Sequence, residues 1–132
     1  KIFIDRSESE FKHCQFINNK EIKKILKKKG FKIVKTGQLD FISQINLFNN
    51  AKMIVGPHGA AFSNLVFCKN KTKVLEIKPY VRPNNYKIIS KINKLKYNQI
   101  NLPSLGDTYD NGDMYIDPNK LLKKIKILEK NV

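Results

Sequence analysis

Tryptophan is absent from this 132-residue sequence, cysteine occurs twice, and arginine occurs only as Arg6 and Arg82. Two cysteines, Cys14 and Cys68, are too few for a disulfide framework and lack zinc-site spacing, so we expect thiols in a reducing compartment. No hydrophobic run approaches the ~20 residues that span a bilayer. No signal peptide is recognisable, because the sequence opens with a strand pattern, KIFID. We therefore expect an excised domain or the C-terminal part of a larger protein.

Acidic residues are also scarce: 26 lysines and arginines face 11 aspartates and glutamates, for a net charge of +15. Such an excess is compatible with nucleic acid, an anionic membrane or a phosphorylated ligand as partner. Nearly all of it is lysine, however, in a sequence rich in asparagine and isoleucine, as an AT-rich genome produces. Arginine is the usual reader of bases and phosphates. We therefore predict a solvated lysine surface and no nucleic-acid partner, with a polyanion or membrane contact as the alternative.

Strand patterns alternate with helix patterns along the chain. Strands are predicted at 1–5, 31–35, 52–56, 72–78 and 98–102, and helices at 20–30, 41–51, 59–67, 86–96 and 118–130. The expected apolar helix faces are Ile22, Ile25 and Leu26; Phe41, Ile45 and Phe48; Ile88, Ile92 and Leu95; and Leu121, Leu122, Ile125 and Leu128. The last face predicts packing on a sheet, with membrane contact as the alternative. The alternation predicts a single α/β domain over 1–132, with a parallel sheet of about five strands and helices on both faces.

The sequence GPHGAA, residues 56–61, lies where the third strand ends and the third helix begins. Ligands of such sheets bind beyond the carboxyl ends of the strands, near the point where strand order reverses. The first amides of a helix lack intrahelical partners and attract phosphate. We expect Gly59, Ala60 and Ala61 to offer these amides and His58 to donate a hydrogen bond to a phosphate oxygen. The alternative is a tight turn that His58 caps.

Two charged residues are predicted at the same edge. Arg6 follows the first strand, where its guanidinium could grip a diphosphate or pair with an acidic residue in 8–10. Glu76 lies in or at the end of the fourth strand, where a carboxylate needs a partner. Sugar hydroxyls are one such partner. An ion pair with Lys73 or Lys78, or an edge position, is the alternative.

Other polar residues give weaker signals. Ser63 and Asn64 lie one turn into the third helix and could face a ligand, pack or stay exposed. We expect no metal site at His13 and Cys14, and the aspartates of 107–113 fit no calcium loop, so we interpret them as turn formers. The chain lacks the Gly-x-Gly-x-x-Gly and Walker patterns of nucleotide cofactors. It also lacks an Asp-x-Asp motif.

The segment GPHGAAFSNLVF, followed by KVLEIKP, resembles the signature of glycosyltransferase family 61, the capsular polysaccharide biosynthesis type. The matching residues are Gly56, Pro57, His58, Gly59, Ala60, Asn64, Phe67 and Glu76. Similarity extends to Arg6 and Ser7, to Gln44, Phe48 and Ala51, and to MYIDP before the last helix. The family often has a second arginine before the first helix; here Cys14 or Gln15 stands there, and Lys12 or His13 would have to substitute.

This resemblance implies the C-terminal, donor-binding lobe of a GT-B type glycosyltransferase, whose N-terminal lobe holds the acceptor site and commonly the catalytic base. It implies inverting, metal-independent transfer from a uridine diphosphate sugar to a glycan acceptor in polysaccharide biosynthesis, with no further cofactor. Arg6 and His58 would be catalytic, stabilising the diphosphate leaving group. The implied substrate contacts are Arg6, Ser7, Gly56, His58, Gly59, Ala60, Ala61, Asn64 and Glu76. The expected location is cytoplasmic, with or without peripheral contact to the inner face of the membrane.

Two other functional classes stay open. One is a non-catalytic, basic Rossmann-like module that binds a polyanion or anionic membrane; its binding would be salt-sensitive and blind to sequence. The other is a different enzyme with a phosphate-binding lobe.

Overall fold

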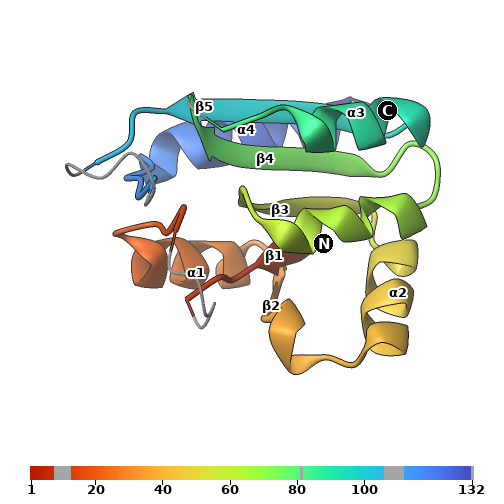
Figure 1. Cartoon of the computed structure of the whole chain (residues 1–132). Coiled ribbons are helices and arrows are strands. Elements are labelled where there is room, and N and C mark those ends of the chain that lie inside the picture. Colours follow the sequence, from red (N-terminus) through yellow and green to blue (C-terminus); the bar gives the residue numbers. More distant parts are fainter. Residues whose placement is uncertain (8–12, 81, 106–111, 132) are drawn as a thin grey trace.

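The chain folds into a five-stranded sheet with helices on both sides, as seen in a computed structural model that describes residues 1–7, 13–80, 82–105 and 112–131 (Figure 1). The strands are β1 (Ile2–Ile4), β2 (Lys32–Val34), β3 (Met53–Pro57), β4 (Lys73–Pro79) and β5 (Lys96–Leu102). The helices are α1 (Asn19–Lys28), α2 (Phe41–Asn50), α3 (Asn85–Ile92) and α4 (Pro118–Lys130), with 3₁₀ helices η1 (Thr36–Gln38) and η2 (Ala60–Phe67). None of the helices described is both long and apolar enough to cross a membrane.

All paired strands run parallel, in the order β2-β1-β3-β4-β5. The predicted α/β, Rossmann-like fold is thereby confirmed. From β1 the chain first moves outward to β2 and then returns to the other side of β1 with β3. Strand order therefore reverses between β1 and β3. In open parallel sheets, ligands bind beside the carboxyl ends of the strands at this position.

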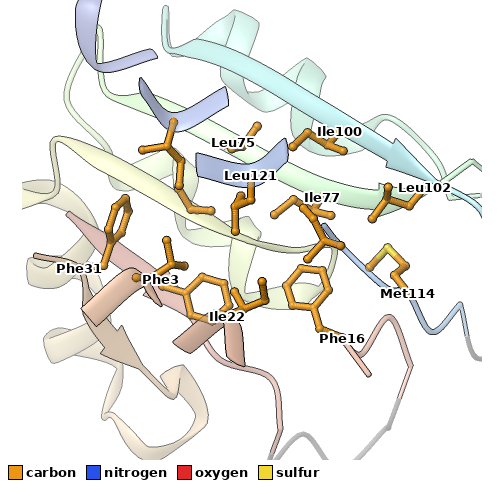
Figure 2. Packing of buried hydrophobic residues seen from close by; sticks show 14 of the residues in the cluster. Phe3, Phe16, Ile22, Phe31, Leu75, Ile77, Ile100, Leu102, Met114 and Leu121 are labelled. Atoms are coloured by element: carbon orange, nitrogen blue, oxygen red, sulfur yellow. The ribbon is translucent and has the colours of Figure 1, made fainter. Parts of the chain in front are cut away.

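Each face of the sheet has its own hydrophobic layer. On one face, α1 and α4 cover alternate strand residues; Figure 2 shows Phe3, Leu75, Ile77 and Ile100 of the strands together with Ile22 and Leu121 of the helices. On the other face, α2, η2 and α3 cover Ile4, Ile54 and Val74. Because neighbouring strand residues point to opposite faces, Glu76 projects toward the η2 and α3 side.

Helix boundaries follow the predicted capping residues. Asp40 Oδ1 accepts a hydrogen bond of 2.7 Å from the amide of Ser43 at the start of α2. Asp117 caps α4 in the same way, with Pro118 as its first residue. Gly30 ends α1 at a φ of +81°, a conformation that glycine adopts without steric cost.

Two predicted apolar helix faces are partly wrong. Ile88 and Ile92 of α3 are 60% and 74% exposed, because the buried side of this helix runs through Tyr86 and Ser90. The helix also ends at Ile92, before the predicted boundary, and the chain enters β5 at Lys96. Phe41 of α2 is likewise exposed. By contrast, Leu121, Ile125 and Leu128 of the predicted α4 face pack on the sheet, whereas Leu122 is half-buried outside that cluster.

Candidate active site

Arg6 and His58 both lie at the carboxyl edge of the sheet, where they follow β1 and β3. A Cβ built on Gly59 would lie 1.2 Å from Nη1 and 2.3 Å from Cζ of Arg6, so the guanidinium lies directly on the Gly59 backbone. Gly59 has a φ of 169°, which any residue adopts, so the glycine provides room and not an unusual conformation. We predicted that a ligand would approach this backbone. In the structure Arg6 fills that space.

The backbone around Arg6 is fixed by three hydrogen bonds. The amide of Asp5 donates to Val34 O (2.8 Å), and the amide of Ser7 donates to Asp5 Oδ1 (2.9 Å). The Arg6 carbonyl accepts from Gln15 Nε2 at 2.9 Å. Gln15, one of the two positions where the family's second arginine was expected, therefore holds the backbone of Arg6.

Asp5 supports this turn from inside the protein. Its side chain is buried and accepts hydrogen bonds from Asn19 Nδ2 (3.0 Å) and Lys23 Nζ (3.1 Å). Burial alone would raise the pKa of Asp5, but the bonds from Ser7, Lys23 and Asn19 outweigh it and lower that pKa. Asp5 is therefore a carboxylate at neutral pH whose hydrogen bonds face α1.

The Arg6 side chain keeps hydrogen-bonding capacity. Burial lowers its pKa from the ordinary value, although an arginine stays charged at neutral pH. Its buried Nε has no hydrogen-bond partner among the described residues. The alternative ion pairs with Glu8 and Glu10 lie outside the described residues, as do the predictions for Lys12, Asp107 and Asp110.

His58 is only 8% exposed, and a buried carboxylate holds it from the inner side. Its Nδ1 lies 2.5 Å from Glu76 Oε1, so Nδ1–H donates to Glu76. The ring also packs against Tyr86, with 5.1 Å between the ring centroids. Because the two ring nitrogens lie on opposite sides of an imidazole, Nε2 points away from Glu76.

The environment of Glu76 differs from our prediction that this side chain contacts sugar hydroxyls. Its side chain has 0% exposure, and its second oxygen, Oε2, accepts from the Tyr97 hydroxyl. Burial, that hydrogen bond and the charge of Glu76 together raise the pKa of Tyr97. Both carboxylate oxygens are thus engaged by His58 and Tyr97. Glu76 is a positioning residue for His58, and not the surface ion-pair partner of Lys73 or Lys78 that was the alternative.

The helix that follows His58 and Gly59, η2, is of the 3₁₀ type. Its first hydrogen bond runs from the amide of Phe62 to Gly59 O at 3.0 Å. The amides of Ala60 and Ala61 therefore precede the helical ladder. Ala60 is exposed and Ala61 half-buried, and phosphate binding by their amides stays a prediction.

Two predicted ligand contacts serve packing in this structure. Asn64 Nδ2 donates to Gln44 Oε1 (2.9 Å), and Gln44 Nε2 donates to Thr36 O (2.9 Å), which ties η2 to α2 and η1. A Cβ on Gly56 would lie 2.9 Å from Ile4 Cβ, so this glycine allows β3 to approach β1. Both are buried. Ser7 is exposed beside Arg6, and its contact with substrate stays a prediction.

Two tyrosines of the site were missed in the sequence analysis. Tyr97 precedes the predicted strand 98–102, whereas β5 begins at Lys96 and brings Tyr97 opposite Val74. Tyr86 was interpreted only as the start of a helix. A signal existed in Glu76 itself, because a carboxylate in an apolar strand requires polar partners on neighbouring strands.

No group of three His, Cys, Asp or Glu side chains that could hold a metal ion occurs among the described residues. Metal independence nevertheless stays a prediction. Both cysteines are free and buried, and burial raises the pKa of the Cys68 thiol to about 12.

Comparison with known proteins supports one family. The sequence model of the family described as Glycosyltransferase 61 matches residues 1–75, a segment that contains Arg6 and His58. A β-1,2-xylosyltransferase, RCN11, of rice (Oryza sativa subsp. japonica) is 40% identical over 62 residues, which make up 46% of the chain and 11% of the relative. The chain thus spans about a tenth of the length of this curated relative.

Proposed function

Because the chain belongs to the glycosyltransferase 61 family, we propose that it is the donor-binding domain of a glycosyltransferase, holding a nucleotide-diphosphate sugar at the carboxyl edge of its sheet. The donor is a uridine diphosphate sugar, and the sugar passes to a glycan acceptor during polysaccharide biosynthesis. The acceptor site and the catalytic base belong to an N-terminal lobe of the same protein. The transfer inverts the anomeric centre and needs no metal.

One observation carries this proposal: Arg6 and His58 lie together where strand order reverses. Arg6 reaches this point from β1 and His58 from β3; Gln15 holds the backbone of Arg6, and Glu76 holds the ring of His58. In the transition state, negative charge develops on the departing diphosphate. A guanidinium beside Gly59 and an imidazolium N–H whose ring is held by Glu76 stabilise that charge.

Each of the two side chains has a distinct task. Arg6 provides permanent positive charge and several N–H donors to phosphate oxygens. His58 provides a directed donor at Nε2 when its ring carries both protons, because Nδ1–H already donates to Glu76 and fixes the ring. The buried hydrogen bond between His58 and Glu76 therefore determines the direction in which Nε2 points toward the leaving group.

The test is calorimetric titration of uridine diphosphate (UDP) into the 132-residue chain and three variants. Arg6→Met and His58→Ala are expected to weaken binding by roughly thirtyfold, the loss of one hydrogen bond to a charged group, about 2 kcal/mol. Lys52→Met is the matched control, because Lys52 is exposed and precedes β3 at the opposite edge of the sheet. Thermal melting reports whether each variant is folded.

The basic-module alternative predicts a different result. A polyanion-binding surface would lose equal affinity in Arg6→Met and Lys52→Met, and its binding would fall steeply with salt. Equal binding of UDP by wild type and Arg6→Met would overturn the proposed site. Since the rice relative is named a xylosyltransferase, UDP-xylose is the first sugar donor to compare with UDP.

A further inference from the structure

Exposed isoleucines lie on the outer side of α3, the helix whose predicted apolar face turned out to be solvent-exposed. Ile88 and Ile92 are one helical turn apart, so their side chains are neighbours on the surface. Val66, at the end of η2, is 51% exposed. The side-chain amide of Asn93 donates to Leu65 O (3.0 Å) and Val66 O (2.9 Å), which places Val66 beside the end of α3. The three apolar side chains therefore belong to one surface, on the face of the sheet opposite α1 and α4.

Lysines surround these apolar side chains. Lys87 and Lys91 are exposed on α3, and each directly precedes one of the two isoleucines. Lys71 and Lys94 are exposed in two neighbouring turns, where the Lys71 amide donates to Lys94 O at 2.9 Å. Both turn lysines adopt a positive φ, 70° and 55°, a conformation that glycine or asparagine adopts at a lower cost. The two turns thus carry long cationic side chains at positions where steric preference favours small residues.

The lysines of this surface have no acidic partner among the described residues. Residues 41–106 contain nine lysines and a single acid, Glu76, whose side chain is completely buried. On the opposite face, by contrast, Lys1 pairs with Glu129 of α4 at 2.8 Å. The surface of α3 and the end of η2 is therefore cationic as well as apolar.

This combination of side chains fits a lipid bilayer better than a soluble polyanion. A polyanion is bound by the ammonium groups alone, so the isoleucines between them would contribute nothing. At an anionic bilayer, lysines meet the lipid head groups while neighbouring apolar side chains enter the boundary with the acyl chains. The sequence left membrane contact open for α4, but Leu121, Ile125 and Leu128 of that helix pack on the sheet.

We propose that the isoleucines and lysines of α3, together with Val66, Lys71 and Lys94, bind an anionic lipid bilayer as a peripheral contact. The contact goes beyond the proposed function and does not depend on it. It uses a face of the sheet, whereas the proposed donor site lies at the carboxyl edge.

The test is co-sedimentation of the 132-residue chain with vesicles of phosphatidylcholine alone and of phosphatidylcholine and phosphatidylserine in equal parts. We expect wild type to bind the mixed vesicles, with an affinity that falls as salt rises, and to bind the neutral vesicles roughly tenfold or more weakly. Lys87→Gln with Lys91→Gln should weaken binding by roughly thirtyfold, since each lysine near an anionic surface contributes roughly fivefold. Ile88→Asn with Ile92→Asn should weaken it by roughly tenfold or more.

Matched substitutions on α4 separate this surface from the overall charge of the chain. Lys123→Gln with Lys126→Gln removes the same charge from exposed positions, and Ile127→Asn removes an isoleucine that is 47% exposed. Both controls should stay within about threefold of wild type, because charges outside the contact are screened beyond about 10 Å. All replaced side chains are exposed, so every variant should keep the melting temperature of wild type.

Losses of affinity confined to the two α3 variants would support the lipid contact. Absence of binding to the mixed vesicles by wild type would overturn it, whatever the result with UDP. Equal losses from the lysine pairs of α3 and α4 would also overturn it, because the charge would then act without a defined surface. Full affinity in the isoleucine variant beside a loss in the α3 lysine variant would assign the surface to a soluble polyanion instead. A dimer in analytical ultracentrifugation that disappears in the isoleucine variant would assign it to a second copy of the chain.

Discussion

Replacement of Gly59 by alanine tests the site without removing any of its polar groups. The new Cβ would lie 1.2 Å from Arg6 Nη1, and ordinary contact begins at 3.4 Å, so the guanidinium must move by about 2.2 Å. Hydrogen bonds tolerate only about 0.5 Å of variation in donor–acceptor distance. The displaced guanidinium thus loses its bond to phosphate, and we expect UDP affinity to fall by roughly thirtyfold, about 2 kcal/mol.

Stability should change much less than binding. Gly59 has an extended backbone, and the clashing atoms are the far end of a flexible side chain, so the fold can accommodate alanine by turning Arg6 outward. We expect a change in unfolding free energy below about 1 kcal/mol by urea denaturation. Gly37→Ala is the matched control, because a Cβ there meets nothing within 4 Å. Equal UDP affinity of the two variants would refute the role given to Arg6.

The remaining predictions concern the buried hydrogen bonds behind the site. Tyr97→Phe should destabilise the fold by about 1–2 kcal/mol at pH 7, because Glu76 loses a buried donor; Tyr80→Phe, 70% exposed, should not. The raised pKa of Tyr97 means that its contribution is complete below pH 10.0 and declines above it, so the difference between wild type and Tyr97→Phe should shrink in alkaline urea titrations. The pKa of Asp5 is lowered, so its carboxylate stabilises the fold at pH values above the ordinary pKa of 3.8. The penalty of Asp5→Asn should therefore be largest at neutral pH and vanish as pH falls through the folded-state pKa; a constant penalty would contradict this.

Most of the fold could be predicted because it depends on local signals. Asp40 and Asp117 define helix starts through hydrogen bonds to residues two or three positions away, Pro118 favours the first helical position by its fixed φ, and Gly30 ends a helix by its own conformation. Strand residues were recognised by their apolar pattern. Alternation of strands and helices then left a parallel sheet as the consistent arrangement.

The partners within the site could not be predicted, because they depend on which strands become neighbours. Glu76 forms hydrogen bonds with both His58 and Tyr97 because β4 lies between β3 and β5. Asn64 and Gln44 are 20 residues apart, and their hydrogen bond follows from the packing of η2 on α2. The match to the family motif predicted a ligand contact for Asn64, whereas its side-chain amide donates to Gln44 in the structure.

The distribution of acids and bases at the edge argues for an anionic ligand over a purely structural turn. A histidine that merely capped a turn would need no buried carboxylate behind it, and the carboxylate would be costly to bury without a partner. Here Glu76 and His58 satisfy each other inside the protein. Asp5 is likewise committed to Lys23 and Asn19. Because these two acids face inward while Arg6 stays at the edge with Nε unpartnered among the described residues, a bound anion is the partner that we propose for its charge.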